Sequence, residues 1–211
     1  MGTPVDHVIK ASRLIAPEGR EGDPWSFDSL AGRVSELSEE LSFGALTFAV
    51  ELLSAAQERS EPAAWVSARS SLFFPPDLAE NGIDLSAVTV VAAGNVQEAA
   101  WAADLLARSG AFGLLVVDIG RNAKITDGAM ARLVHLARRY HILMLFLTEK
   151  RRSAPSLSSL ISVHAFVRST AVERPTEEAP RISVDVTIVK DKRRAPGVAI
   201  GRKYEAPAGV R

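Results

Sequence analysis

Apolar residues in this chain gather in short segments whose spacing alternates between that of strands and that of helices. Segments of strand length lie at 34–37, 63–67, 87–91, 114–118, 142–147 and 164–168. Helical spacing is found at 46–56, 97–109 and 127–140, and a separate amphipathic helix is expected at 5–15. Strands that alternate with helices predict an α/β fold, a mostly parallel twisted sheet flanked by helices.

The pattern changes near the end of the chain. Apolar residues alternate with polar ones across 181–189, and 198–200 is the expected hairpin partner, with a turn at 196–197. We therefore expect antiparallel strands at the C-terminal end of the sheet. Residues 1–24 are interpreted as an N-terminal helix and linker, 25–204 as one core domain and 205–211 as a flexible tail. Gly110 is the expected stop of one helix and Asp127 the expected N-cap of another.

Composition removes several classes of function. The 211 residues include no cysteine, so disulfides and thiolate metal sites are excluded, and the four histidines lack metal-ligand spacing. No apolar run has transmembrane length and no secretory signal is present, so a cytoplasmic protein without a membrane partner is expected. Residues 1–100 hold 15 acidic and 6 basic side chains, whereas 101–211 hold 10 acidic and 19 basic ones. This asymmetry suggests a basic face or tail, which permits contact with nucleic acid or with an acidic partner surface.

A strand, a loop and a helix near residue 40 have the layout of a phosphate-binding loop. Aligned to G-x-x-x-x-G-K-[ST], the segment 39–46 places Glu39 at the first glycine and keeps Gly44 as the second. Ala45 replaces the lysine and Leu46 replaces the magnesium-binding hydroxyl. Without an ammonium group for the phosphates or an oxygen for magnesium, we expect no nucleotide cofactor, no metal and no ATPase activity. The plainer alternative is a strand–loop–helix turn that never bound nucleotide.

Several segments together resemble the RecA family of recombinases. The match runs without gaps from 33 to 57 and continues, in the family's order, at 83–84, 104–111, 116–118 and 189–196. The resemblance implies a RecA-like core and places Asp118 at the Walker B aspartate. It also places Arg69 where the family has its catalytic glutamate and Glu149 at its nucleotide-sensing glutamine. The family's DNA-binding loop is expected to be shortened to 150–156.

A small RecA-like chain with these losses looks most like the ImuA family, a degenerate branch of the RecA/SulA group. That resemblance implies a role in DNA-damage-induced mutagenesis, within the SOS response and error-prone translesion synthesis. It implies RecA, or error-prone polymerase subunits such as ImuB-like proteins, as partners. DNA and a second copy of the chain are further candidates.

Two basic clusters are candidate binding sites for DNA or a protein partner. The first follows a buried strand and consists of Lys150, Arg151 and Arg152, with Arg138 and Arg139 expected to add to the same field. The second lies at the predicted hairpin and consists of Lys190, Lys192, Arg193 and Arg194. Phosphate contacts and plain solvated loop charge are equally good interpretations. No aromatic residue is interleaved with either cluster, which disfavours stacking on single strands.

Three further features keep two interpretations each. Asp118 is a metal ligand or, as we favour, a carboxylate that ends a strand and caps the next turn. The helix at 5–15 docks on RecA or a second copy, or folds back on its own core. Trp65, with the aromatic and proline residues at 73–76, covers the degenerate nucleotide site or forms an exposed patch for a partner. His135 and His141 are assigned to packing or capping.

Four hypotheses of function follow. The first is a pseudo-ATPase that regulates RecA or supports translesion synthesis by mimicking a RecA subunit. The second is a weak ATPase that uses Asp118, which the alanine at position 45 disfavours. The third is a DNA-binding module built on the two basic clusters, and the fourth is a SulA-type inhibitor of cell division.

Overall fold

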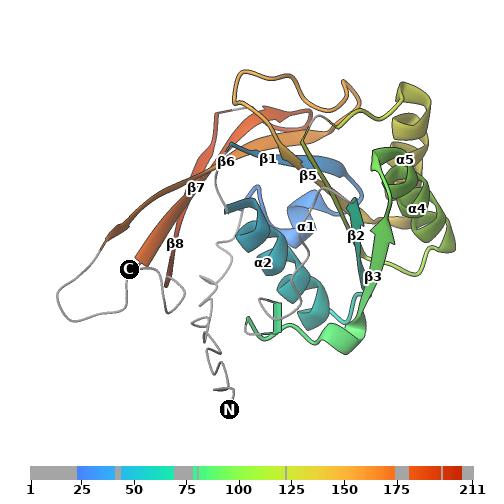
Figure 1. Ribbon diagram of the computed structural model, residues 1–211, viewed down its shortest axis with the longest axis horizontal. Coiled ribbons are helices and arrows are strands. Elements are labelled where there is room, and N and C mark those ends of the chain that lie inside the picture. The colour runs from blue at the N-terminus through green and yellow to red at the C-terminus, as the bar shows by residue number, and fades with distance from the viewer. Residues whose placement is uncertain are drawn as a thin grey trace, which may run out of the picture.

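The computed structural model describes residues 23–40, 44–68, 78–79, 81–121, 123–173, 181–195 and 197–205 (Figure 1). Its centre is an eight-stranded sheet with the order β3-β2-β4-β5-β1-β6-β7-β8. The predicted N-terminal helix, Arg69 and the aromatic and proline residues at 73–76 lie outside the described residues.

The first six strands of the sheet, from β3 to β6 in spatial order, are all parallel, as the alternation of strand and helix predicts. Their bounds are β1 (Val34–Glu39), β2 (Ala63–Ala68), β3 (Val88–Ala93), β4 (Leu114–Arg121), β5 (Leu143–Glu149) and β6 (Val163–Glu173). The central strands β2, β4 and β5 are almost wholly buried, which explains why their sequences are continuous apolar runs rather than alternating ones.

The C-terminal strands β7 (Arg181–Asp191) and β8 (Ala199–Glu205) add antiparallel to β6 and extend away from the helices (Figure 1). The predicted antiparallel end of the sheet is therefore confirmed. Both β6 and β8 are longer than predicted, and β8 includes Glu205, the first residue of the expected tail. The α/β class with antiparallel strands at this end is the fold of the protein.

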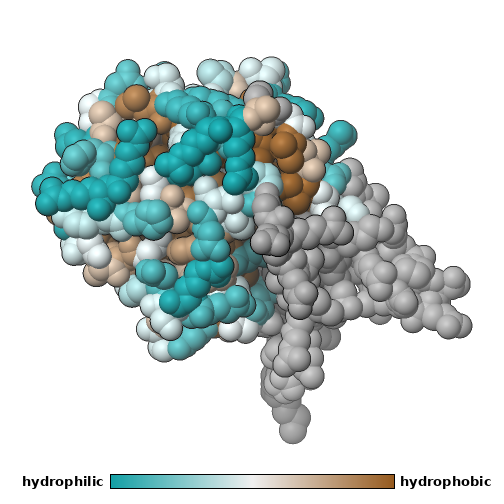
Figure 2. All heavy atoms as spheres, turned by 180° about the vertical axis from the view of Figure 1, so that it is seen from behind, coloured by the Kyte–Doolittle hydropathy of each residue, from teal (hydrophilic) through white to brown (hydrophobic). Residues whose placement is uncertain are grey.

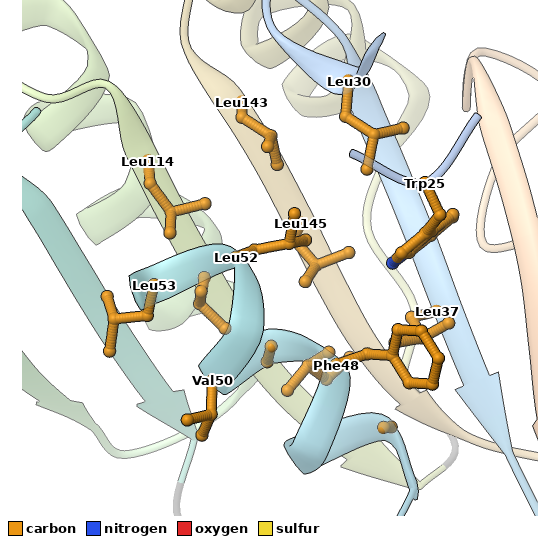
Figure 3. Packing of buried hydrophobic residues seen from close by; sticks show 14 of the residues in the cluster. Trp25, Leu30, Leu37, Phe48, Val50, Leu52, Leu53, Leu114, Leu143 and Leu145 are labelled. Atoms are coloured by element: carbon orange, nitrogen blue, oxygen red, sulfur yellow. The ribbon is translucent and has the colours of Figure 1, made fainter. Parts of the chain in front are cut away.

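Helices cover the two faces of the sheet differently. On one face lie α1 (Phe27–Leu30) and α2 (Gly44–Glu58), and on the other lie α4 (Val96–Ser109) and α5 (Asp127–Tyr140). A short 3-10 helix, η1 (Leu85–Ala87), leads into β3. Figure 3 shows the first core, where Phe48, Leu52 and Leu53 of α2 meet Leu143 and Leu145 of β5. Because these side chains are at most 3% exposed, this core fixes where α2 begins relative to the sheet.

Local signals account for the ends of the second pair of helices. Asn95 caps α4 by accepting from the Glu98 N–H at 2.9 Å, and Gly110 ends it with φ of 64°, as predicted. The predicted N-cap of α5 is wrong by one residue. Thr126 accepts from the Ala129 N–H at 3.3 Å, and Asp127 is the first helical residue. His141 is the C-cap of α5, which confirms its assignment to capping.

Three other expectations are corrected by the fold. Asp118 does not end its strand, because β4 continues through an irregularity to Arg121. Trp65 belongs to no exposed patch, because its ring is fully buried in the core beneath α2. Arg138 and Arg139 lie at the end of α5 that precedes β5, so the length of β5, roughly 20 Å, separates them from the residues that follow it.

Candidate functional site

A carboxylate of the same chain is hydrogen-bonded to the N-terminal turn of α2. Glu39 is the last residue of β1, and its Oε2 accepts the backbone N–H of Ala45 at 3.0 Å. Free N–H groups at a helix N-terminus, together with the helix dipole, are what a phosphate-binding loop offers to a nucleotide. Here a carboxylate of the same chain takes that position.

Packing around the same turn leaves no room for a lysine side chain at position 45. Ala45 is 2% exposed and belongs to the core beneath α2, where Leu46 also packs. A methyl group built on Gly44 would lie 2.4 Å from Cγ1 of Val167 and 2.7 Å from Cγ1 of Val184. Gly44 is therefore required for the close approach of α2 to β6 and β7, a structural role that needs no phosphate.

A pocket of about 760 Å³ opens at the carboxyl ends of β4 and β5. It lies at the edge where ligands bind in open parallel sheets. Its charged lining residues are Glu40, Arg121, Lys124, Glu149, Lys150 and Arg151. Arg121 and Glu149, register partners at the ends of β4 and β5, form an ion pair, and Arg151 Nε lies 4.0 Å from Glu40 Oε1. The ion pair lowers the pKa of Glu149 chiefly through the hydrogen bond from Arg121. The pocket is thus lined by charged side chains, some of which neutralise one another in ion pairs.

Beneath this pocket lies a buried polar network centred on Glu36, which the sequence analysis did not identify. Glu36 is fully buried in the middle of β1 and forms an ion pair with Lys150. Its Oε1 accepts from Thr148 Oγ1 at 2.9 Å, and its Oε2 accepts the Leu157 N–H at 2.7 Å. Because Lys150 and Leu157 both belong to the connection between β5 and β6, Glu36 holds that connection, residues 150–162, against the sheet. We call residues 150–162 the crossover segment.

His164 completes the network from β6. Its Nε2 shares a hydrogen bond of 2.8 Å with Ser38 Oγ, which in turn lies 2.8 Å from Thr148 Oγ1. Burial lowers the pKa of His164, and although Glu36 opposes this change, Lys150 and Lys190 lower the pKa further. The imidazole is therefore neutral at pH 7, which suits a ring enclosed in the sheet face.

The two predicted basic clusters meet the crossover segment from opposite ends. Lys150 donates to the Pro155 carbonyl at 2.8 Å and contacts Glu36, so this ammonium group holds the segment in place. Near the end of β7, Lys190 donates to the Ser159 carbonyl at 3.1 Å, and Lys192, just after the strand, donates to the Leu160 carbonyl at 3.2 Å. Burial, followed by the nearby charge of Lys192, lowers the pKa of Lys190.

The arginines of the two clusters differ from the lysines in exposure. The four residues Arg151, Arg152, Arg193 and Arg194 are all exposed. Of the residues that make up the two clusters, these four present guanidinium groups to solvent, whereas Lys150, Lys190 and Lys192 donate to carbonyls of the crossover segment. The candidate contact surface for a polyanion is consequently made of arginines at the two ends of this segment.

A buried ion pair fixes the far end of the crossover segment. Arg33, just before β1, pairs with Asp191 at the end of β7, and both side chains are at most 2% exposed. Arg33 Nε also donates to Ser162 Oγ at 2.9 Å. Burial by itself would raise the pKa of Asp191, but the hydrogen bonds from Arg33 and from the Arg193 N–H lower it overall. This pair joins the start of β1 to the second basic cluster.

One signal in the sequence pointed to the network and was missed. Glu36 is a charged residue inside a strand that the parallel fold must bury, and buried carboxylates require a partner. Asp118, the Walker B candidate, is 8% exposed within β4, where it pairs in register with Ser67 and Leu147. Among the described residues, no cluster of three or more His, Asp or Glu side chains is arranged to hold a metal ion.

The described helices include none that is both long enough and apolar enough to cross a lipid bilayer. No protein-family model matches this chain.

Proposed function

We propose that this protein is a RecA-like pseudo-ATPase that acts through protein contacts in the DNA-damage response, either by regulating RecA or by supporting error-prone translesion synthesis. The observation that carries the proposal is the carboxylate of Glu39 on the Ala45 N–H, 3.0 Å away, at the start of α2. In this proposal the core keeps the shape of a nucleotide-binding subunit, but its own carboxylate occupies the place of a phosphate, so no nucleotide binds.

The mechanism we propose is subunit mimicry. A RecA-like core could occupy the end of a RecA filament and present no nucleotide to the next subunit, so growth would stop there. The partners named in this proposal rest on the resemblance of the segments at 33–57, 104–111, 116–118 and 189–196 to the RecA family, and on the ImuA-like loss of the reactive groups. The buried side chain of Ala45 supports the loss of ATP binding, since a lysine there would enter the core.

Binding of the purified chain to RecA tests the proposal. The chain is immobilised, and RecA is supplied with and without single-stranded DNA and ATP while binding is followed by interferometry. We expect binding to RecA, together with shorter filaments when the chain is substoichiometric. ATP at millimolar concentration should leave the melting temperature of the chain unchanged. If the folded chain binds neither RecA nor an ImuB-like polymerase subunit, the proposal is wrong.

Direct DNA binding is the second candidate function, and the exposure of Arg151 and Arg152 at the rim of the pocket favours it. Both guanidinium groups lie beyond the carboxyl end of β5, and Arg151 has 84% of its side chain exposed. Arginines in this position can contact phosphates without breaking a buried ion pair.

Charge reversal tests whether Arg151 and Arg152 bind DNA or are only solvated charges on a loop. Arg151→Glu with Arg152→Glu should weaken binding to a labelled oligonucleotide at least tenfold, and the affinity of the unmodified chain should fall steeply with salt. The matched control reverses Arg138 and Arg139, which lie at the opposite end of β5 and should change the affinity little. Equal losses in both double variants would point to non-specific charge attraction and would exclude a site on the crossover segment.

A further inference from the structure

Two pairs of exposed arginines that are far apart in the sequence lie at the same edge of the sheet. α5 ends just before β5 starts, so Arg138 and Arg139 lie at the edge where the parallel strands begin. β7 runs antiparallel to β6 and ends at that same edge, with Asp191 opposite the first residue of β6, so Arg193 and Arg194 follow there. The sequence alone groups the arginines of α5 with the first basic cluster, which lies at the opposite edge.

The end of the crossover segment joins these two pairs of arginines. Leu160 packs against the core beneath α5, and its carbonyl accepts from Lys192 at 3.2 Å, while Lys190 donates to the Ser159 carbonyl. These contacts make one continuous surface, which we call the amino edge. It consists of residues 138–141, 159–162, 189–194 and 198.

Few carboxylates oppose the cations of the amino edge. Between Asp127 and Glu173 the chain has seven lysine and arginine residues and one carboxylate, that of Glu149, which lies at the other end of β5. Asp191, within the amino edge, has 1% of its side chain exposed and is neutralised by the buried Arg33. Six cations of the amino edge are therefore not balanced within it, namely Arg138, Arg139, Lys190, Lys192, Arg193 and Arg194.

Described carboxylates outside the amino edge do not cancel this charge. Asp104 of α4 is already paired with two arginines, one on α4 and one on α5. Asp28, on the α2 face of the sheet, is paired with Arg59. Glu61 precedes β2, and β4 lies between β2 and β5, so Glu61 is about 10 Å from the start of β5. Even if the whole charge of Glu61 is subtracted from the six cations, five positive charges remain.

The stability of α5 accounts for only one of the two arginine pairs. Cations in the last turn of a helix interact favourably with its dipole, which explains Arg138 and Arg139. Arg193 and Arg194 follow a strand, where no such dipole exists. Two exposed pairs on one surface therefore indicate a contact outside the molecule.

Exposed apolar side chains lie among these cations. Tyr140, Val189 and Val198 are 36%, 36% and 42% exposed. The guanidinium of Arg139 lies 5.2 Å from the centre of the Tyr140 ring, so cationic and apolar groups are in contact. Seen from behind, the surface of the described residues is mostly hydrophilic with small separate hydrophobic patches (Figure 2). An occupant with both carboxylates and apolar side chains fits the amino edge, which favours a polypeptide over a polyphosphate.

We propose that the amino edge binds an acidic segment of a protein partner, which runs in an extended conformation across the starts of β5, β1 and β6. Charge complementarity identifies the occupant, because its Asp or Glu residues would pair with the two arginine pairs. β5 and β7 are three strand spacings apart, about 14 Å, which an extended chain crosses in about four to five residues. This surface does not depend on the proposed function, because it does not include the start of α2 and its test contains no RecA.

Short labelled peptides test charge and spacing together, with binding to the full chain followed by fluorescence anisotropy. The probe is Asp-Asp-Leu-Ser-Leu-Asp-Asp, in which apolar residues separate two acidic pairs. Two controls keep its net charge: Asp-Asp-Asp-Asp-Leu-Ser-Leu removes the spacing, and Asp-Asp-Ser-Ser-Ser-Asp-Asp removes the apolar side chains. We expect the probe to bind about tenfold more tightly than either control, and less tightly as salt increases.

Charge reversal locates the site. Arg138→Glu with Arg139→Glu and, separately, Arg193→Glu with Arg194→Glu should each weaken binding of the probe about tenfold. The matched control is the double Glu variant of 151–152, which makes the same change of charge at the opposite edge and should weaken binding less than about twofold. All of these side chains are exposed, so the three double variants should fold as the unmodified chain does.

Three results with the peptides would overturn the proposal. They are no binding of the probe at low salt, equal binding of the control without spacing, and a loss in the variant of 151–152 as large as in the two amino-edge variants. An octamer of thymidine separates a protein partner from a nucleic acid. If the octamer binds more tightly than the probe and loses affinity in the Arg138→Glu, Arg139→Glu variant, the choice of a protein segment is wrong.

Discussion

Replacing Glu36 by glutamine should release the crossover segment from the sheet. The carboxylate is fully buried, forms the ion pair with Lys150 and accepts hydrogen bonds from Thr148 and from the Leu157 N–H. A glutamine can accept the Leu157 N–H with its oxygen and donate from its nitrogen to Thr148 Oγ1, but its neutral amide leaves the Lys150 ammonium group without a counter-charge. Removing one partner of a buried pair costs about 3–5 kcal/mol.

The position of Lys150 refines that magnitude. Its side chain is 18% exposed, so the ammonium group can partly reach solvent once the pair is broken. The lower end of the range, about 3 kcal/mol of unfolding free energy, is therefore expected, and for a domain of this size it lowers the melting temperature by about 10 °C. Glu149→Gln, which breaks the exposed pair with Arg121 at the same pocket, should cost less than about 1 kcal/mol and is the matched control.

Urea unfolding of four proteins tests the reasoning: the unmodified chain, Glu36→Gln, Lys150→Met and the double variant. The double variant should be less destabilised than Glu36→Gln alone, because it leaves no unpaired buried charge. In Glu36→Gln, the amide of Leu157 should also exchange with solvent faster, while that of Leu145 in β5 should not change. A loss below about 1 kcal/mol, or fully additive losses in the double variant, would refute the assignment of Glu36 as the anchor.

The remaining predictions concern α2 and the buried histidine. Ala45→Lys should lower the unfolding free energy by several kcal/mol without creating ATP-dependent thermal stabilisation, because the ammonium group enters the core; stabilisation by ATP in a thermal shift assay would contradict the packing argument. Gly44→Ala should cost about 1–3 kcal/mol in urea unfolding, because its methyl group would lie 2.4 Å from Val167, and an unchanged midpoint would show that β6 yields freely. The folded-state pKa of His164 is lowered, so its contribution to stability is complete above the unfolded-state pKa of about 6.5 and is lost as pH falls through the folded-state value. His164→Gln should flatten the dependence of unfolding free energy on pH below about 6.5, and an equal slope in both proteins would assign it to other groups.

The elements of the fold were predictable to the extent that local signals control them. Asn95 and Gly110 delimit α4 through a side-chain cap and a left-handed residue, both of which depend on nearby sequence alone. The start of α5 was misplaced because Thr126 and Asp127 are both good capping residues and the choice depends on the direction of the entering chain. Strand ends were less predictable, since β6 reaches Glu173 by pairing with β7, which is distant in sequence.

The candidate site divides in the same way. The sequence alone determined that position 45 carries no ammonium group and position 46 no hydroxyl, which are the two groups that a P-loop uses to bind phosphate and magnesium. Only the tertiary structure decided that Glu39 turns back to the start of α2 and that Glu36 holds the crossover segment. The physical reason is that chemical identity belongs to each residue, whereas burial, pairing and charge balance depend on neighbours brought together from distant segments by the sheet.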